Sequence, residues 1–430
     1  MNQLTKELND VLLAKCPKIY EMLSEKGKEI YFPKMGILGQ SAEAKNTKIN
    51  ATIGAAIEDD GSPMRLASID SKIDMDPSMS FPYAPSFGRP DLRARWKQMI
   101  FEKNEKLKGS EISLPVVTNA LTHGISMVGY LFADPGQEII VSNYFWDNYD
   151  LIFNNGYGAH LTEFNLFKNG GFDVDSMKAA LLTGGEKKVI ILNFPNNPSG
   201  YTPTFEEMKS ITAALKEVAD KGKKIVVVTD DAYFGLVFEE GIEPQSIFAY
   251  IADLHENILA VKVDGPTKED YVWGFRVGFI TYNYKGADAS VYSALESKTA
   301  GAVRGNISNA SNLSQSLLLS AFDAPTYAKE KQEKFDIMQK RYNACKEALK
   351  DPKYKEFFSP LPYNSGYFMC VIPKDGINCE ELRALLIKKY GIGVINLNNV
   401  IRIAFAAVAA KDIKPLFEGL YEACKELSNK

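Results

Sequence analysis

Two cations lie in one short segment of the chain, VKVDGPTKEDYVWGFRVG, between two apolar runs. Lys268 lies in a turn-rich stretch after the run 258–263, and Arg276 follows eight residues later, at the start of the run 276–282. A primary amine can attack a carbonyl carbon and form a Schiff base, and a guanidinium can hold a phosphate or carboxylate through two parallel hydrogen bonds. Taken alone, the two residues could equally be solvated surface charges.

Three further apolar runs bring side chains that could join the same site. Trp146 follows the run 137–143, Asn197 follows the run 187–194, and Asp230 ends the run 223–230 with Tyr233 just after it. In open α/β sheets, ligands bind beyond the carboxyl ends of the strands, so we expect these residues at one rim. A Schiff-base lysine, an acid for a pyridinium nitrogen and an aromatic ring for stacking together indicate pyridoxal 5'-phosphate.

From about residue 50 to the C-terminus, the order and spacing of these motifs resemble the fold-type I pyridoxal-phosphate aminotransferases of class I/II, especially their aspartate aminotransferase branch. NNPSG is similar to the family's N-P-[ST]-G turn, and DDAY is similar to its D-x-A-Y motif. The resemblance implies a role for each residue: Lys268 forms the Schiff base, Asp230 pairs with the pyridine nitrogen, Asn197 and Tyr233 reach the phenolic oxygen, Arg276 grips the phosphate, and Trp146 stacks on the ring.

Four more residues extend the resemblance. Thr122, in NALTHG, lies where the family binds phosphate at a helix start, and Tyr83, in YAPSFG, matches a tyrosine that reaches the phosphate of the neighbouring subunit. Arg402, in RIAFA, matches the arginine that holds the substrate α-carboxylate. Gly54 lies in a segment similar to the N-terminal loop that closes over the substrate. The resemblance therefore implies a homodimer.

The phosphate end of the predicted site departs from the family pattern. Close relatives usually carry a phosphate-binding serine three residues before the lysine, and this chain has Gly265 there. Either the hydroxyl of Thr267 or a backbone N–H could replace the serine. Asp264 would bring a negative charge close to the phosphate, which is unfavourable unless its side chain points away.

Arg304 bears on the substrate. The stretch VRGNISNAS resembles the R-x-x-x-S-N segment of the dicarboxylate-specific branch, whose arginine reaches into the neighbouring subunit and binds the distal carboxylate of the substrate. This would make aspartate, glutamate and 2-oxoglutarate natural substrates. The alternative is that Arg304 pairs with an acid at the dimer surface.

The resemblance implies an aminotransferase that moves an amino group between an amino acid and a 2-oxo acid by a ping-pong mechanism. A lyase or β-decarboxylase on the same scaffold is the alternative, because the same cofactor stabilises several carbanions. Regulators that carry this fold behind a DNA-binding domain are a further alternative, but no basic helix-turn-helix extension is visible before residue 50.

The elements that must position these residues form an α/β pattern. The five runs named above are short, rich in Val and Ile and apolar throughout, as in strands that are buried on both faces of a mostly parallel sheet. Between them, residues 204–222 show helical spacing, with Thr204 as N-cap and Gly222 at the end. Alternating strands and helices indicate a large domain with helices on both faces of a central sheet.

The last hundred residues predict a smaller α+β unit. We expect a long charged helix over 326–351, followed by strand 366–373, helix 378–391, strand 400–407 and helix 411–429. The segments GILGQ and IGAAIEDDGSP near the N-terminus are expected as loops. The predicted division is 1–64 as an N-terminal arm and part of the small domain, 65–325 as the large cofactor-binding domain, and 326–430 as the small C-terminal domain.

Composition narrows the classes of function. The chain has 430 residues, a net charge of −4 and no basic block, so nucleic acid is not an expected partner. No apolar run approaches the ~18 residues of a membrane span, and the polar start does not resemble a secretory signal. Five scattered cysteines indicate a reduced, cytoplasmic protein, and three widely separated histidines make a metal site an unlikely expectation.

Overall fold

A seven-stranded sheet dominates the computed structural model, which describes residues 2–31, 36–397 and 399–428. The strands lie in the order β2 (Val116–Thr118), β10 (Gly278–Tyr284), β9 (Ile258–Asp264), β8 (Lys224–Asp230), β7 (Lys187–Asn193), β3 (Glu138–Ser142) and β4 (His160–Phe164). From β9 to β4 all pairs are parallel, and β10 is antiparallel to both neighbours. The expected α/β fold with a mostly parallel sheet is confirmed.

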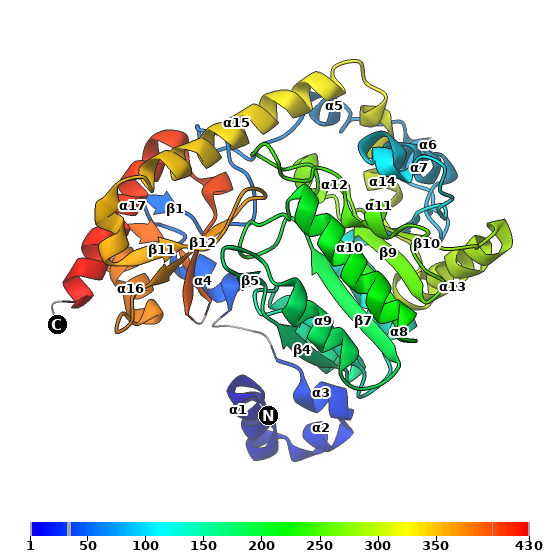
Figure 1. Ribbon diagram of the computed structural model, residues 1–430, viewed down its shortest axis with the longest axis horizontal. Helices are drawn as coiled ribbons and strands as arrows, with labels where there is room; N and C mark the ends of the chain where they lie inside the picture. Colours follow the sequence, from blue (N-terminus) through cyan, green and yellow to red (C-terminus); the bar gives the residue numbers. More distant parts are fainter. Residues whose placement is uncertain (1, 32–35, 398, 429–430) are drawn as a thin grey trace.

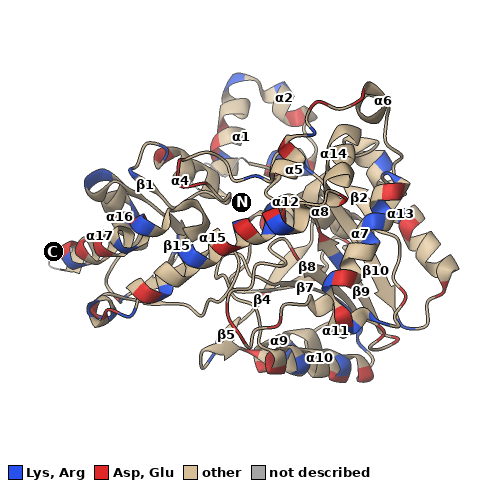
Figure 2. Cartoon of the chain, turned by 90° about the horizontal axis from the view of Figure 1, so that it is seen from above, with Lys and Arg blue, Asp and Glu red and all other residues tan. Residues whose placement is uncertain are grey.

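Helices cover both faces of this sheet (Figures 1 and 2). α9 (Val174–Leu182), α10 (Phe205–Asp220) and α11 (Ile247–Ile251) lie on one side, and α8 (Ala120–Phe132) and α13 (Ala289–Ile307) lie on the other. α10 buries Met208, Ile211, Leu215 and Val218 and turns its charged residues outward. Because the inner strands β7, β8 and β9 are covered on both faces, most of their side chains are apolar, which explains the continuous Val/Ile runs.

A second, four-stranded antiparallel sheet forms the C-terminal unit. Its strands are β11 (Phe358–Pro360), β12 (Met369–Pro373), β15 (Val400–Ile403) and β14 (Ile395–Leu397), in that order. α16 (Cys379–Leu385) and α17 (Ala410–Ser428) pack with it. The long helix α15 (Tyr327–Ala348) runs from the large sheet to this unit and crosses the top of Figure 1.

The N-terminal segment touches both units. α1 (Gln3–Lys15), α2 (Pro17–Met22) and α3 (Glu25–Glu29) form a small cluster below the large sheet in Figure 1, where Lys26 donates to the Gly156 carbonyl at 2.5 Å. α4 (Ile37–Glu43) then packs on β14, and β1 (Ile49–Asn50) pairs in parallel with β13 (Ile392–Gly393).

Three sequence expectations were wrong in detail. GILGQ begins helix α4 instead of forming a loop, because the Gln40 side chain exchanges two hydrogen bonds with the backbone of Asn396. Strand 400–407 ends at Ile403 and continues as a 3₁₀ turn (Phe405–Ala407), where the Ala406 carbonyl accepts from buried Arg341. Helix 378–391 widens into a π-helical turn at Leu386–Tyr390 and ends at left-handed Gly391.

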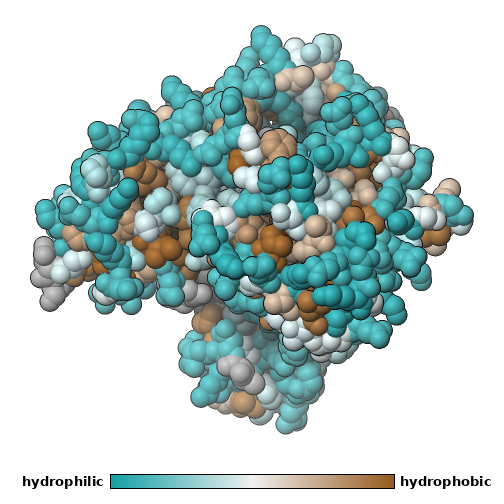
Figure 3. Space-filling model, in the orientation of Figure 1, coloured by the Kyte–Doolittle hydropathy of each residue, from teal (hydrophilic) through white to brown (hydrophobic). Residues whose placement is uncertain are grey.

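Apolar side chains appear only in small, separate patches on the face drawn in Figure 3, among hydrophilic residues. Within the described residues, none of the helices combines the length and the apolar character needed to cross a bilayer.

The N-terminus of α10 provides a test of local stability. Thr204 accepts from the Glu207 backbone N–H, and Glu207 accepts in return from the Thr204 N–H, which completes a capping box. We predict that Thr204→Ala lowers the opening free energy of this helix by about 1 kcal/mol. Hydrogen exchange of the amides in 205–212 should accelerate about fivefold. Thr212→Ala in the same helix is the control, and equal acceleration in both variants would contradict the prediction.

Candidate active site

Five predicted site residues meet at one rim of the large sheet. β3, β7, β8 and β9 run in parallel, so their carboxyl ends lie side by side, with Asn193 opposite Asp230 and Asp230 opposite Val263. The segments that leave these ends carry Trp146, Asn197, Asp230 with Tyr233, and Lys268. The parallel topology therefore collects residues that lie more than a hundred positions apart in the chain.

Asp230 is buried at the end of β8 with 3% of its surface exposed. The Tyr149 hydroxyl donates to its Oδ2 at 2.5 Å, and the Ala232 N–H donates to its Oδ1 at 3.2 Å. Burial raises the pKa of the Asp230 carboxyl, whereas the hydrogen bond from Tyr149 and the charge of Lys268 lower it. A carboxylate in such a place is ready to pair with a cationic ring nitrogen.

Lys268 lies in the short helix α12 (Pro266–Glu269), directly after β9. Its Nζ is 5.0 Å from the centre of the Tyr233 ring, and the Tyr367 hydroxyl donates to its backbone carbonyl at 2.8 Å. Burial lowers the pKa of the Lys268 amine to about 8; the charge of Arg276 acts in the same direction, and Asp230 opposes it. An amine with this pKa is partly neutral, and therefore nucleophilic, near neutral pH.

Beside Lys268, the start of α8 comes into close contact with the backbone. A Cβ placed on Gly278 would lie 2.6 Å from the Ala120 carbonyl carbon, and one on Gly265 would lie 2.8 Å from the Val277 oxygen. No side chain caps α8, so its first N–H groups and positive dipole end are available to an anion. The helix carries half-buried Thr122, the residue predicted at this position.

Thr267 and Asp264 bear on the missing phosphate-binding serine. The Thr267 hydroxyl is buried and has no hydrogen-bond partner among the described residues. The Asp264 carboxylate accepts from the Trp96 indole at 3.0 Å and pairs with Lys262 at 3.3 Å, so it is held by other groups. Arg276 adds an exposed guanidinium, from a backbone with φ of 55°, that donates to the Trp273 carbonyl. A hydroxyl, helix N–H groups and a cation thus fit a phosphate.

Arg402 anchors the other end of the site. It is 2% exposed, and it donates to Asn197 Oδ1 at 3.2 Å and to the Thr52 carbonyl at 3.3 Å. Its guanidinium lies 4.3 Å from the Phe368 ring centre, and its Nε has no partner in the described part of the chain. A Cβ on Gly54 would lie 3.7 Å from the same ring. A buried guanidinium with an unused donor suits a carboxylate.

Tyr83 and Arg304 lie apart from this cluster. Tyr83 is 90% exposed, and Arg304, near the end of α13, is exposed and donates to the Ser308 hydroxyl at 2.7 Å. The resemblance assigns both residues to the site of the neighbouring subunit, and that assignment stays a prediction.

Sequence reasoning missed the residues that orient the predicted ones. Tyr149 binds Asp230 and meets the Trp146 ring edge-on, with centroids 5.7 Å apart. Asn193 donates to the Asp230 carbonyl and accepts from the Asn197 N–H at 2.7 Å. Tyr149 lies three residues after Trp146, and Asn193 is the last residue of a strand. Their place at or just after a strand end is the sequence feature that could have identified them as site residues.

The fold and the site together define a class. A half-buried lysine with a lowered pKa, a buried acid, an adjacent aromatic ring and an uncapped helix start lie at the strand ends of an α/β sheet. This donor set fits pyridoxal phosphate, and it is that of a pyridoxal-phosphate-dependent enzyme. Residues 58–420 match the aminotransferase class I and II family. The chain belongs to this family, whose members are pyridoxal-phosphate-dependent transaminases.

Curated relatives are remote but consistent. The chain is 23% identical to the arginine–pyruvate transaminase of Pseudomonas aeruginosa over 388 residues, which is 88% of each chain. It is 26% identical to a probable N-acetyl-LL-diaminopimelate aminotransferase of Bacillus subtilis over 198 residues, or 46% of this chain and 47% of the relative. That match, and one to a probable aspartate/prephenate aminotransferase of Aquifex aeolicus, span about half the relatives' length.

Solved structures show the same fold. An aminotransferase from Anaerococcus prevotii aligns with a TM-score of 0.81 and 24% identity, over 94% of this chain and 99% of that one. A multiple substrate aminotransferase from Thermococcus profundus aligns with a TM-score of 0.78 and 17% identity, over 96% and 99%. The fold-type I assignment made from the motifs is confirmed.

The lowered pKa of Lys268 predicts how the apoenzyme takes up its cofactor. Only the neutral amine attacks an aldehyde, so the rate of combination with pyridoxal phosphate should rise with pH and reach half its maximum near pH 8. Stopped-flow absorbance measures this rate, and Nα-acetyl-lysine run in parallel corrects for titration of pyridoxal phosphate itself. A midpoint near 10.5, the ordinary lysine value, would contradict the buried environment.

Proposed function

We propose that this chain transfers the amino group of an amino acid to a 2-oxo acid through pyridoxal phosphate, in two half-reactions. One observation carries the proposal: the amine of Lys268 and the carboxyl of Asp230 are both withdrawn from water at adjacent strand ends, close enough for each charge to shift the other's pKa. Family membership over 58–420 supports it.

In this proposal each residue acts through a contact that its position allows. Lys268 would hold the cofactor through its amine and would take the proton from the α-carbon of the substrate. Asp230, oriented by Tyr149, keeps the ring nitrogen protonated. Bound pyridoxal phosphate supplies an electron sink for the substrate carbanion and carries the amino group between the half-reactions.

The remaining residues hold the ends of the cofactor. Trp146 stacks on the ring, and Asn197 and Tyr233 bind the phenolic oxygen. Arg276, Thr122 and the start of α8 bind the phosphate, and we add Thr267 because its buried hydroxyl has no partner in the described chain.

Arg402 binds the α-carboxylate of the substrate in this proposal. Its two Nη atoms donate to Asn197 and to the Thr52 carbonyl, and its guanidinium lies over the Phe368 ring. Its Nε has no partner among the described residues and can donate to a substrate. Gly54 belongs to the segment that closes over the substrate. A carboxylate held at this point would orient the substrate in the site.

The assembly and the finer substrate assignment are also proposals. We infer a homodimer in which Tyr83 reaches the phosphate of the partner site and Arg304 reaches a distal carboxylate there, as in the dicarboxylate-specific branch. The exposure of both side chains supports this, because neither lies in the site of its own subunit and each is accessible to a partner subunit. The domain boundaries at 64/65 and 325/326 and a cytoplasmic location rest on the sequence pattern. The related proteins are named as aminotransferases, so we do not propose a lyase.

The reaction can be tested one half at a time. Each of the twenty amino acids is added to the holoenzyme without an acceptor, and conversion of bound pyridoxal phosphate to pyridoxamine phosphate is quantified by chromatography. We expect glutamate and at least one further amino acid to react. Lys268→Ala should slow conversion at least about a hundredfold, because the general base is gone. Lys285→Ala, at an exposed lysine, is the control. Transamination at the wild-type rate in Lys268→Ala would refute the assignment.

Hybrid dimers test whether Arg304 acts across the interface. Co-expression of a Lys268→Ala chain with an Arg304→Ala chain, each with its own tag, gives dimers in which one site has both lesions and the other has neither, if Arg304 acts in the partner. Glutamate activity should then reappear at roughly half the wild-type value per dimer. If Arg304 acts in its own subunit or only on the surface, the hybrids should show no gain over the mean of the parents.

A further inference from the structure

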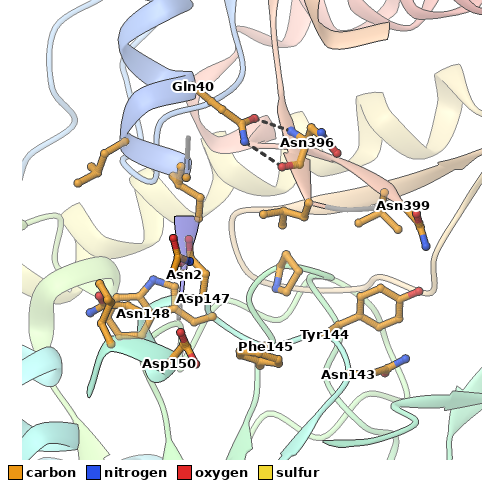
Figure 4. A pocket seen from close by; sticks show the side chains of 18 of the residues that line it. Asn2, Gln40, Asn143, Tyr144, Phe145, Asp147, Asn148, Asp150, Asn396 and Asn399 are labelled. Carbon is orange, nitrogen blue, oxygen red and sulfur yellow. Dashed lines mark hydrogen bonds between the residues drawn. The ribbon is translucent and has the colours of Figure 1, made fainter. Parts of the chain in front are cut away.

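A cavity of about 790 Å³ adjoins the proposed active site (Figure 4). Glu163 of β4 and Pro198 each contribute one residue to its wall, and three parts of the chain build the rest: the segment 143–151 after β3, the N-terminal segment with α4, and the strands β14 and β15. Gln40 and Asn396 join the last two parts through two hydrogen bonds of 2.7 and 3.0 Å, drawn in Figure 4. The cavity wall is therefore fastened across segments that are 356 positions apart.

This cavity borders the residues proposed to hold cofactor and substrate. Trp146 is part of its wall, and so is Pro198, the neighbour of Asn197. Val400 lines it as well, and Arg402 lies two residues further along β15, on the same face of the strand. A substrate held by Arg402 through its α-carboxylate thus has this space beside it, and its side chain can enter.

Negative charge dominates the wall. Asp147, Asp150 and Glu163 line the cavity, and its described lining residues include no lysine, arginine or histidine. None of the three carboxylates forms an ion pair with any residue that the structure describes. Figure 4 places Asp147 and Asp150 close together beside Asn148. Asp147 and Glu163 are exposed, and Asp150 is half-buried and accepts from the side-chain amide of Asn154. Carboxylates that face a cavity without a cationic partner attract a cation and repel another carboxylate.

The rest of the wall suits a long side chain. Tyr31, Phe145, Trp146 and Leu397 offer apolar surface to a methylene stem, and the amides of Asn143, Asn148 and Asn399 offer acceptors around it. Burial raises the pKa of the Tyr31 hydroxyl, and the charges of Asp150 and Asp147 add to this effect, which places that hydroxyl near both acids.

We propose that this cavity receives the side chain of the amino donor and selects one that ends in a cation, such as a guanidinium or a primary ammonium group, with Asp147 and Asp150 as its partners. The inference rests on the proposed transamination and deepens it. A dicarboxylate would bring a further negative charge to this wall, so it would have to use another arrangement, such as the partner subunit's arginine in the proposed dimer. The two halves of the reaction would then use different side-chain contacts.

A pair of probes that differ by one charge tests the cavity. L-Arginine and L-citrulline have side chains of the same length. Arginine ends in a cationic guanidinium group, and citrulline has an oxygen in place of one nitrogen, which makes its end group neutral. In the half-reaction of the holoenzyme, kcat/KM for arginine should exceed that for citrulline by about tenfold or more, as expected for hydrogen bonds to a charged group. In Asp147→Asn with Asp150→Asn the ratio should fall toward one. Asp175→Asn, at a surface acid paired with Lys168, is the control and should keep the ratio.

The readout is the ratio of kcat/KM for arginine to kcat/KM for citrulline. A general loss of activity in the double variant lowers both values equally and leaves this ratio unchanged. Equal use of both probes by the wild-type enzyme would overturn the inference, and so would a ratio that survives in the double variant. The wild-type comparison stands even if the double variant fails to fold. If no amino acid reacts, glutamate included, the proposed transamination itself fails; a reaction with glutamate but no preference for arginine refutes only the cavity assignment.

Discussion

The rim that carries the proposed site depends on a buried ionic cluster at the ends of β8 and β9. Lys262, in β9, is 1% exposed and pairs with Asp231, just after β8, and with Asp264, at the end of β9. Taking a lysine from water costs several kcal/mol unless opposite charges and hydrogen bonds replace the water. Here both carboxylates have a further donor, the Ser246 hydroxyl at 2.6 Å and the Trp96 indole at 3.0 Å. The cluster therefore fixes the ends of two adjacent strands.

Those two strand ends carry the proposed chemistry. Asp230 precedes Asp231 and has different partners, so neighbouring carboxylates serve opposite sides of the sheet, one structural and one facing the site. Lys268 follows Asp264 by four residues. Directly after it, Glu269 pairs with Lys103 and Lys331, and Asp270 pairs with Lys331. Lys268 thus lies between two acidic segments that other residues hold in place. Its pKa is low because its amine is withdrawn from water and forms no ion pair with any residue that the structure describes.

Much of this could be predicted from sequence because it depends on local pattern. Runs of Val and Ile placed β7, β8 and β9 within a residue or two, and the parallel topology then brought Asn197, Asp230 and Lys268 together. The N-cap at Thr204 could be predicted in the same way, whereas its capping box with Glu207 was found only in the structure. What escaped prediction depends on contacts between distant segments. The turn at Phe405–Ala407 forms because Arg341 binds there, and α4 forms beside Asn396, with no local signal for either.

The difference between local pattern and contacts of distant segments also separates the residues proposed for the chemistry from those proposed to select the substrate. The residues proposed to hold the cofactor occur in motifs of a few letters, since they must follow a strand end at a fixed offset. The cavity beside Arg402 instead draws its wall from the N-terminal segment, the loop after β3 and the last strands. The residues that each segment contributes to this wall are only weakly constrained by their neighbours in sequence. A chain can therefore keep the cofactor motifs while the charge of this wall changes. Relatives that share the family but are named for aspartate, for N-acetyl-diaminopimelate or for arginine are what such an arrangement would produce.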